Sequence, residues 1–454
     1  MSGAEILTPP AADDQGYFDD LVRDATAALV GDEVLLANVA GETTDFIRLN
    51  RGAVRQAGTV DQRTLTVDLV EGERHVAGRI RLTGDREVDR ARTRALLADL
   101  REQRRHVSED PFLLYNTEPV TTERVERGVI PDPAAALADI RTAAKGRDLV
   151  GIYAAGDTFN GFANSLGQRN WFQSTTFNLD WCFYLRADKA AKNLYAGFDW
   201  DDDAFAAKIE MSTRQLAALE REPITLTPGE YRTYLAPRAL EELLQLMSWY
   251  GAFGMEAHQT RQTPLLKMIV DGTRLSPKLT ISEETANGVA PNFQSAGFVR
   301  PDRVPLIVEG AYAETLVSPR SAREYGVPTN GATTHEFPES VAIAPGDIPT
   351  RAVNEALGTG LFVGNLWYTN FSDRAACRTT GMTRFGTFWM DDGEIVAPVN
   401  VLRFDDTAYN LFGDGLVGLT DEAEMLLDTE TYGERSTASS RLPGAVVEAM
   451  RFVL

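Results

Sequence analysis

Residues 360–404 alternate apolar and polar side chains over several short runs, and this pattern constrains the fold more than any other part of the chain. A period of two is typical of strands that bury one face, and Gly, Asn and Asp between the runs favour tight turns. Asp391-Asp392-Gly393 stands between the apolar segments 388–390 and 395–396, which predicts a hairpin turn. This part of the chain is therefore expected to form an antiparallel sheet.

The chain of 454 residues is too long for one ordinary hydrophobic core, so two domains are expected. The break is predicted at Glu222-Pro223, because the residue before a proline is disfavoured in a helix. The predicted class is α+β. Residues 1–222 would form a mixed α/β N-terminal domain, and residues 223–454 a β-rich C-terminal domain with antiparallel sheets.

Local patterns predict the individual elements. A meander of short strands is expected at residues 34–36, 44–49, 64–69 and 76–82, and helices at 86–106, 131–144 and 201–221. Pro237 begins an amphipathic helix with an apolar stripe from Leu240 to Gly254, and this helix is expected to end at His258. Two more helices are expected near residues 349–357 and 421–427.

Composition excludes several classes of function. A formal charge of −21 would repel phosphate backbones, so nucleic-acid binding is not expected, and the basic segment 101–106 is interpreted as the solvated end of a helix. No window approaches the roughly 18 apolar residues of a membrane span. The N-terminus lacks the basic and apolar regions of a secretory signal. With only two cysteines, Cys182 and Cys377, a reducing, cytoplasmic location is expected.

Four histidines offer few routes to a metal site. Glu256 and His258 are two residues apart, so they point to different faces of a helix, and a capping or exposed histidine is the simpler interpretation. His335-Glu336 begins like a zincin motif, but no second histidine follows, and Pro338 prevents a helix there.

Cys377 is the other candidate for a reactive group. Arg374 and Arg378 lie close to it in sequence and would favour a thiolate. No histidine lies in the same segment, and a half-buried strand cysteine is the more common situation.

Four segments, in the same order along the chain, resemble the TldD/PmbA family of metallopeptidase-complex proteins. Residues 162–167 (FANSLG) are similar to the family's N-S-x-G turn, 279–284 (LTISEE) to its L-T-I-x-D-D segment, and 328–331 (PTNG) to its P-T-G-N turn. Residues 360–404 resemble its Gly-rich β-core, with a T/S-x-G-x-F/W and a G-E-I…P-V pattern.

The resemblance also implies where a catalytic metal site should be. The TldD branch holds a metal with an H-E-x-x-x-H helix and a cysteine near the C-terminus, ligands that leave a position open for water. Placed on this sequence, the two histidines fall near Trp249 and Gly254, the glutamate near Tyr250, and the cysteine near Tyr432. None of these residues can serve, so no metal and no catalytic residue is expected in this chain.

The loss of those ligands is similar to the TldE/PmbA-like branch. That resemblance implies a non-catalytic subunit, inactive alone, that forms a dimer with a TldD-like metallopeptidase. Zinc or a similar metal would reside in the partner, and the complex would process peptides or unfolded protein segments. The matched segments supply the expected groove-lining or structural residues: Asn164, Ser165, Asn365, Trp367, Arg384, Trp389 and Asn400.

Two alternatives remain open from the sequence. One is a self-sufficient hydrolase of the same fold, with Glu256, His258 and His335 at an atypical metal site or Cys377 as the nucleophile. The other is a peptide-binding or assembly protein without a role in proteolysis.

Overall fold

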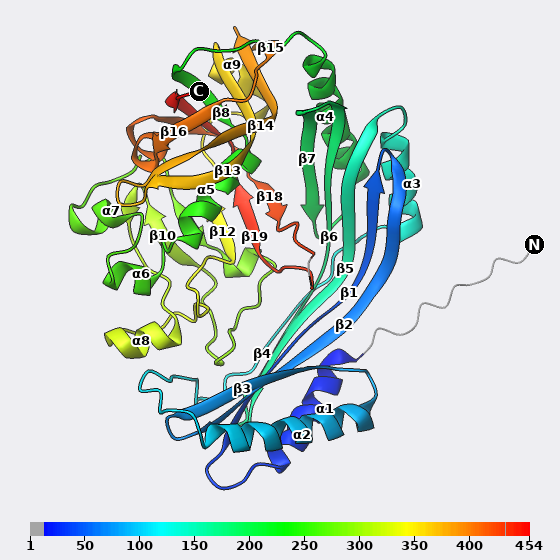
Figure 1. Ribbon diagram of the computed structural model, residues 1–454, viewed down its shortest axis with the longest axis vertical. Coiled ribbons are helices and arrows are strands. Elements are labelled where there is room, and N and C mark those ends of the chain that lie inside the picture. The colour runs from blue at the N-terminus through cyan, green and yellow to red at the C-terminus, as the bar shows by residue number, and fades with distance from the viewer. Residues whose placement is uncertain (1–12, 432) are drawn as a thin grey trace, which may run out of the picture.

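The computed structural model describes residues 13–431 and 433–454, and its N-terminal domain is built on one long, curved sheet (Figure 1). The order of the seven strands is β3-β2-β1-β5-β6-β4, with β7 paired to β6. The strands are β1 (Val34–Asn50), β2 (Ala53–Glu71), β3 (Arg74–Arg81), β4 (Thr122–Glu126), β5 (Asp148–Asn164), β6 (Arg169–Arg186) and β7 (Lys189–Gly197). Apart from β4, which runs parallel to β6, neighbouring strands are antiparallel.

The predicted meander of short strands was wrong in its strand lengths. The segments expected at 34–36 and 44–49 belong to the single strand β1, and the segment expected at 64–69 is part of the 19-residue strand β2. The short strand expected at 76–82 is confirmed as β3. Gly41 does not end β1. A Cβ there would lie 2.3 Å from the ring of Phe159 on β5, so this glycine allows close cross-strand packing.

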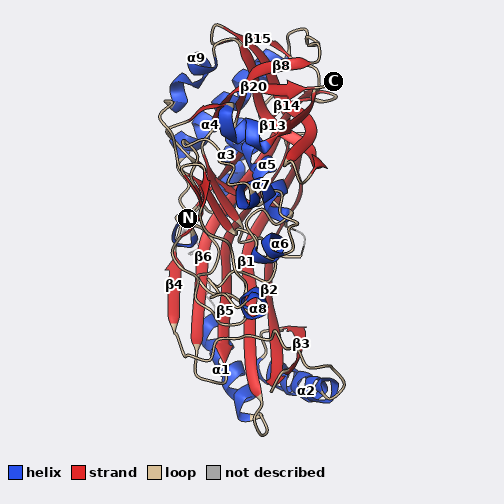
Figure 2. Cartoon of the chain, turned by 90° about the vertical axis from the view of Figure 1, so that its left-hand side faces the viewer, coloured by secondary structure: helices blue, strands red, loops and turns tan. Residues whose placement is uncertain are grey.

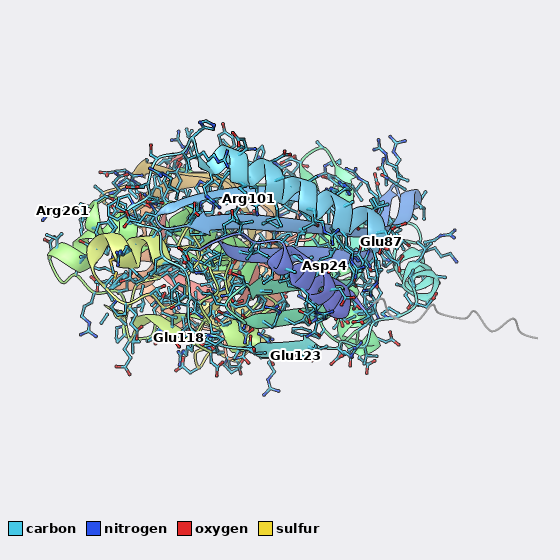
Figure 3. The ribbon with its side chains drawn as sticks, turned by 90° about the horizontal axis from the view of Figure 1, so that it is seen from below. Asp24, Glu87, Arg101, Glu118, Glu123 and Arg261 are labelled. Carbon is cyan, nitrogen blue, oxygen red and sulfur yellow. The ribbon has the colours of Figure 1, made fainter. Side chains whose placement is uncertain are left out.

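Four helices cover the outer face of this sheet. Helices α1 (Asp14–Ala27) and α2 (Arg86–Arg104) lie against its lower end, which Figure 3 shows from below, and α3 (Pro133–Ala143) and α4 (Asp202–Leu219) cover its upper end. Each helix begins after an aspartate whose carboxylate accepts a backbone N–H of the first turn, as expected of an N-cap. The three helices predicted in this half are therefore confirmed within a few residues.

The C-terminal domain contains two sheets. One has six strands in the order β11-β10-β9-β12-β19-β18; the other has the order β13-β8-β20-β16-β14-β15, with β17 on β20. Because β13 also pairs with β14, five strands of the second sheet close into a ring. Most pairs are antiparallel, as predicted, with β8–β13 and β12–β19 as parallel exceptions. The strands are β8 (Gly229–Leu235), β9 (Ile281–Glu283), β10 (Val304–Val308), β11 (Ala311–Tyr312), β12 (Ser340–Ile343), β13 (Gly360–Asp373), β14 (Arg378–Asp391), β15 (Glu394–Pro398), β16 (Arg403–Thr407), β17 (Leu416–Leu419), β18 (Glu424–Leu427), β19 (Ser439–Leu442) and β20 (Ala445–Phe452).

The predicted hairpin in this domain is confirmed. Asp391 pairs with Glu394 across the β14–β15 turn, and Asp392 and Gly393 both have positive φ, 49° and 78°, as a type I′ turn requires. The helix expected near residues 421–427 is wrong, because Glu424–Leu427 forms β18 and pairs with β19. The helix expected near 349–357 is present as a short 3₁₀ turn followed by α9 (Val353–Leu357).

The helix predicted to run to His258 is interrupted. Helix α5 (Pro237–Trp249) ends before Gly251, which has a φ of 77°, and Gly254 then caps a separate short helix, α6 (Met255–Gln259). The apolar stripe of α5 lies in the largest hydrophobic core, between the two sheets of the C-terminal domain. Other short helices are α7 (Leu266–Val270) and α8 (Pro319–Tyr325).

The whole molecule is elongated, and the strands of the N-terminal sheet run along much of its length (Figure 2). Within the described residues, none of the helices combines the length and apolar character that a membrane crossing would need.

Candidate binding site between the domains

The inner face of the N-terminal sheet looks toward the C-terminal domain. Near its lower end Leu36, Phe162 and Phe172 form an apolar cluster with Phe293 of the second domain. Higher up, this face carries charged and polar side chains among apolar ones, and the connection between β18 and β19 approaches β5 and β6 (Figure 1). The strand alternation of a half-buried sheet thus places a surface of mixed polarity between the domains.

A cavity of about 470 Å³ opens on this mixed surface. It is lined by residues of β1, β2, β5, β6 and β7 together with two residues of the β18–β19 connection. The lining residues are Glu42, Thr44, Phe46, Arg48, Leu49, Gln56, Val60, Val150, Gly151, Ile152, Ala154, Asp180, Trp181, Cys182, Lys192, Thr431 and Arg435.

Two charged groups define one end of the cavity. Glu42 is buried, and its carboxylate accepts hydrogen bonds from Thr44 Oγ1 at 2.7 Å and Gln62 Nε2 at 2.6 Å. The guanidinium of Arg435 donates to the carbonyl of Gly156 at 3.2 Å and to the hydroxyl of Thr176 at 2.7 Å. Desolvation of the Arg435 guanidinium lowers its pKa to about 10.

A second charged cluster lies at the other end. Lys192 Nζ is 2.9 Å from Asp180 Oδ2, and Arg238 on α5 pairs with the buried Glu241. Burial raises the pKa of Glu242 on the same helix, although Arg238 and Lys192 oppose the shift. Cations and carboxylates from both domains therefore meet beside the cavity.

Aromatic rings of the β13–β14 pair form a rim next to Lys192. The guanidinium of Arg384 lies 3.9 Å from the ring centroid of Trp367 and 4.8 Å from that of Phe385, and Lys192 Nζ lies 5.9 Å from Phe385. Trp367 is 50% exposed and Tyr368 is 74% exposed. Exposed aromatic faces stacked with a guanidinium suit contact with a peptide chain. We call Trp367, Tyr368, Arg384 and Phe385 the aromatic rim.

The predicted groove residues divide into two groups. Trp367 and Arg384 belong to the rim, and the buried Asn365 pairs with Arg384 across the two strands. The other four lie elsewhere and support the fold.

Asn164 is fully buried and accepts the N–H groups of Leu166 and Gln168, which holds the β5–β6 turn. Ser165 accepts the N–H of Leu35. Trp389 packs edge-to-face on Tyr231, and Asn400 Nδ2 donates to Thr225.

The residues at the predicted metal positions do not fit a metal ion. Trp249 is 71% exposed and packs on Phe337, Tyr250 packs edge-to-face on Phe371, and Gly254 has no side chain. Indole and glycine offer no donor to zinc, which prefers Cys, His and carboxylate ligands. Tyr432, the fourth predicted position, lies outside the described residues.

The atypical site proposed from sequence is dispersed. His258 Nε2 lies 3.1 Å from both the carbonyl oxygen of Ala252 and the hydroxyl of Tyr312, and burial lowers its pKa. His335 is exposed and stacks on Phe337. Within residues 13–431 and 433–454, no three His, Cys, Asp or Glu side chains form a group that could hold a metal ion.

Cys377 is fully buried in the turn before β14, with a φ of 46°, and not on a half-exposed strand as expected. Burial raises the pKa of its thiol to about 12, so the two neighbouring arginines do not produce a thiolate. Cys182 lies in the core, as predicted, and lines the cavity.

Sequence reasoning missed the cavity residues Glu42, Asp180, Lys192 and Arg435. Their one sequence signal is alternation: Asp180 and Glu42 occupy positions on the same sheet face as the apolar Leu36 and Phe172. Arg435 is far from them in sequence, so only the folded chain brings these charges together.

Comparison with known proteins agrees with this architecture. The crystal structure of TldE from Thermococcus kodakarensis superposes with a TM-score of 0.76 at 14% identity, covering 96% of this chain and 100% of that one. A candidate modulator of DNA gyrase from Thermotoga maritima gives 0.73 at 13% identity, covering 97% and 100% of the two chains. Another from Bacteroides thetaiotaomicron gives 0.72 at 16%, covering 97% and 99%. These similarities show the fold.

A search of curated proteins gives no significant sequence match. The family description of the PmbA/TldA metallopeptidase C-terminal domain matches residues 228–453, which span the strands β8 to β20. The chain thus belongs to the PmbA/TldD family.

Proposed function

We propose that this chain is a TldE/PmbA-like, non-catalytic subunit of a cytoplasmic metallopeptidase complex that processes peptides or unfolded protein segments. The observation that carries the proposal is the identity of the residues at the family's metal positions. Trp249, Tyr250 and Gly254 would leave a metal and its water without ligands or a base. A TldD-like partner would supply the metal, and no catalytic step is assigned to this chain.

The contribution of this subunit would be to bind and orient the peptide. The cavity between the domains contains hydrogen-bonding groups of positive and of negative charge. The aromatic rim beside it adds flat apolar surfaces. Such a combination can hold an extended chain without selecting one side-chain sequence, because the contacts reach backbone groups and generic apolar surface.

Co-expression with a TldD-like protein from the same genome tests this proposal. The two chains are expected to co-purify as a dimer, and the complex to cleave an unfolded substrate such as casein, with loss of activity on metal chelation. The separated chain should be inactive and should contain no stoichiometric zinc. Zinc bound tightly to this chain alone would favour the self-sufficient hydrolase. Absence of a complex would favour a peptide-binding protein without a role in proteolysis.

A matched pair of variants locates the peptide contact. Arg384→Ala removes the cation from the aromatic rim, and Arg403→Ala removes an arginine from β16, which lies outside the rim and the cavity lining. We expect Arg384→Ala to raise the KM of the complex for casein several-fold with little change in kcat, because it removes binding energy common to ground and transition states. Arg403→Ala should leave both constants unchanged.

A further inference from the structure

Arg435 is a desolvated cation whose hydrogen-bond partners are all neutral groups. Its three hydrogen bonds go to the carbonyls of Gly156 and Thr176 and to the Thr176 hydroxyl, at 3.2, 3.3 and 2.7 Å. Among the described residues no carboxylate forms a hydrogen bond or ion pair with its guanidinium, and the acids that act on it, Glu42 and Asp157, do so only at longer range. A desolvated cation of this kind is normally paired in proteins.

The surroundings of Arg435 hold it in place for a partner. Thr176 lies on β6 and Gly156 on β5, and a Cβ at Gly156 would lie 2.1 Å from the carbonyl oxygen of Thr43, so this sheet position is closely packed. The guanidinium is therefore fixed by three bonds to the sheet, while Arg435 also lines the 470 Å³ cavity. A planar guanidinium fixed at a cavity wall is well suited to receive a carboxylate.

The same cavity also contains, on Asp180, a hydrogen-bond acceptor without a partner in the described part of the chain. Asp180 uses Oδ2 to bind Lys192, while its Oδ1 is buried and has no hydrogen-bond partner among the described residues. Buried acceptors of this kind are rare, and a peptide N–H would satisfy Oδ1. The volume of the cavity lies in the range of pockets that hold small ligands, roughly 300–1,000 Å³.

We propose that the cavity binds the carboxyl-terminal end of a peptide, with its α-carboxylate paired to Arg435 and a backbone N–H donated to Asp180. This inference rests on the proposed peptide-binding function and adds the identity of the group that is recognised. Arg48, which also lines the cavity, adds a second positive charge on the same face of the sheet. The subunit would thus hold the end of the peptide and leave the chain extending toward the partner.

Binding to the purified full-length chain tests this inference. The probes are two fluorescein-labelled hexapeptides of one neutral sequence, one ending in a free carboxylate and the other in an amide, compared by fluorescence anisotropy. We expect the free acid to bind about tenfold or more tightly than the amide, as a charge-assisted pair in a desolvated site implies. A third peptide, amidated but with a glutamate as its last residue, separates a side-chain carboxylate from the terminal one and should bind like the neutral amide.

Variants then assign the effect to Arg435. Arg435→Gln should bind the acid and the amide equally, and Arg435→Lys should keep part of the preference, since it retains charge without the planar fork. Arg55→Gln, which changes an exposed arginine outside the cavity, should behave like the wild-type chain.

Two results would overturn the inference: equal binding of the acid and amide by the wild-type chain, or no binding of either. Both results are measured on the wild-type chain, so they do not depend on whether a variant folds. Equal binding would leave the proposed function intact, because that depends on co-purification and activity with the TldD-like partner.

Discussion

Glu33 is a buried carboxylate held between two arginines of helix α2. Arg101 Nε and Nη2 lie 2.7 and 2.8 Å from its oxygens, and Arg104 Nη2 lies 3.0 Å away. The basic segment 101–106 is therefore only partly the solvated helix end that its sequence suggests: Arg104 is buried, whereas Arg105 and His106 are exposed. Arg101, labelled in Figure 3, lies on the helix beside the lower end of the sheet.

Glu33→Gln is expected to lower the free energy of unfolding at pH 7 by about 2–4 kcal/mol, because it leaves Arg104 without its nearest buried anion. Hydrogen bonds from Arg101, with those from Val30 N–H and Arg104, lower the Glu33 pKa from 4.5 to about 2. A lowered folded-state pKa stabilises the fold above pH 4.5, and this contribution disappears as the pH falls toward 2. Urea unfolding at pH 7, 4.5 and 3 should show the difference between wild type and variant shrinking.

The control for this experiment is Glu102→Gln on the same helix. Its pairs with Arg105 and His106 are on the surface, with about two-thirds of each side chain exposed, so the variant should change stability by less than 1 kcal/mol at any of these pH values. A cost for Glu33→Gln that is equally small, or that does not depend on pH, would contradict the assignment.

Among the elements, the break between α5 and α6 has the clearest local cause. Gly251 has a φ of 77°, a conformation that other residues adopt only with strain, and a Cβ there would lie 2.4 Å from Cβ of Ala257. The glycine thus ends α5 and lets Ala257 of α6 pack against the turn. Glu256 and His258 are placed by this turn, not by the amphipathic helix that the sequence predicts.

Gly251→Ala is expected to destabilise the protein by about 2–4 kcal/mol, the sum of a left-handed backbone penalty and an overpacked contact. Thermal and urea unfolding of the purified chain would measure it. Gly58→Ala in β2 is the matched control, because Gly58 has no positive φ and its added Cβ would meet the Phe46 ring at an ordinary 3.5 Å. A neutral Gly251→Ala would mean that the turn can relax without cost.

The elements predicted well are those whose cause is local. Helix α2 has an aspartate cap and a one-sided apolar stripe, and the Asp392-Gly393 turn has residues that tolerate positive φ. Elements that depend on contacts distant in sequence were missed. Strand β1 continues through Gly41, where the absence of a side chain makes room for the ring of Phe159, and β18 is a strand because it pairs with β19. Propensity alone cannot supply such tertiary effects.

Local and distant causes also separate the residues of the candidate site. Trp367 and Arg384 lie on the two paired strands of a segment that the sequence predicts to be antiparallel, and the guanidinium stacks on the indole, so a family resemblance was enough to point to them. Arg435 and Thr176 meet only because the β18–β19 connection crosses to the N-terminal sheet. No spacing within the sequence reports that contact.

For the whole molecule, the contact between the domains decides how the chain unfolds. Segment 285–297 of the C-terminal domain lies against the inner face of the N-terminal sheet. There Arg124 donates to the carbonyls of Thr285, Ala286 and Gly288, and Gln168 donates to that of Gly297. At its centre the Phe293 side chain is buried among Leu36, Phe162 and Phe172. Both domains should therefore unfold together in one cooperative transition.

Phe293→Ala tests that coupling. Removing the buried ring should cost about 3–5 kcal/mol, the usual range for truncating a buried phenylalanine, and most of that loss falls on the contact between the domains. Calorimetry should then resolve two transitions where the wild-type chain shows one, and limited proteolysis should cut between the domains near the predicted boundary at Glu222-Pro223. Trp249→Ala, which removes a larger ring that is 71% exposed, should keep a single transition and cost below about 1 kcal/mol. If Phe293→Ala also unfolds in one transition, the remaining backbone contacts of segment 285–297 suffice to couple the domains, and the apolar cluster is not what joins them.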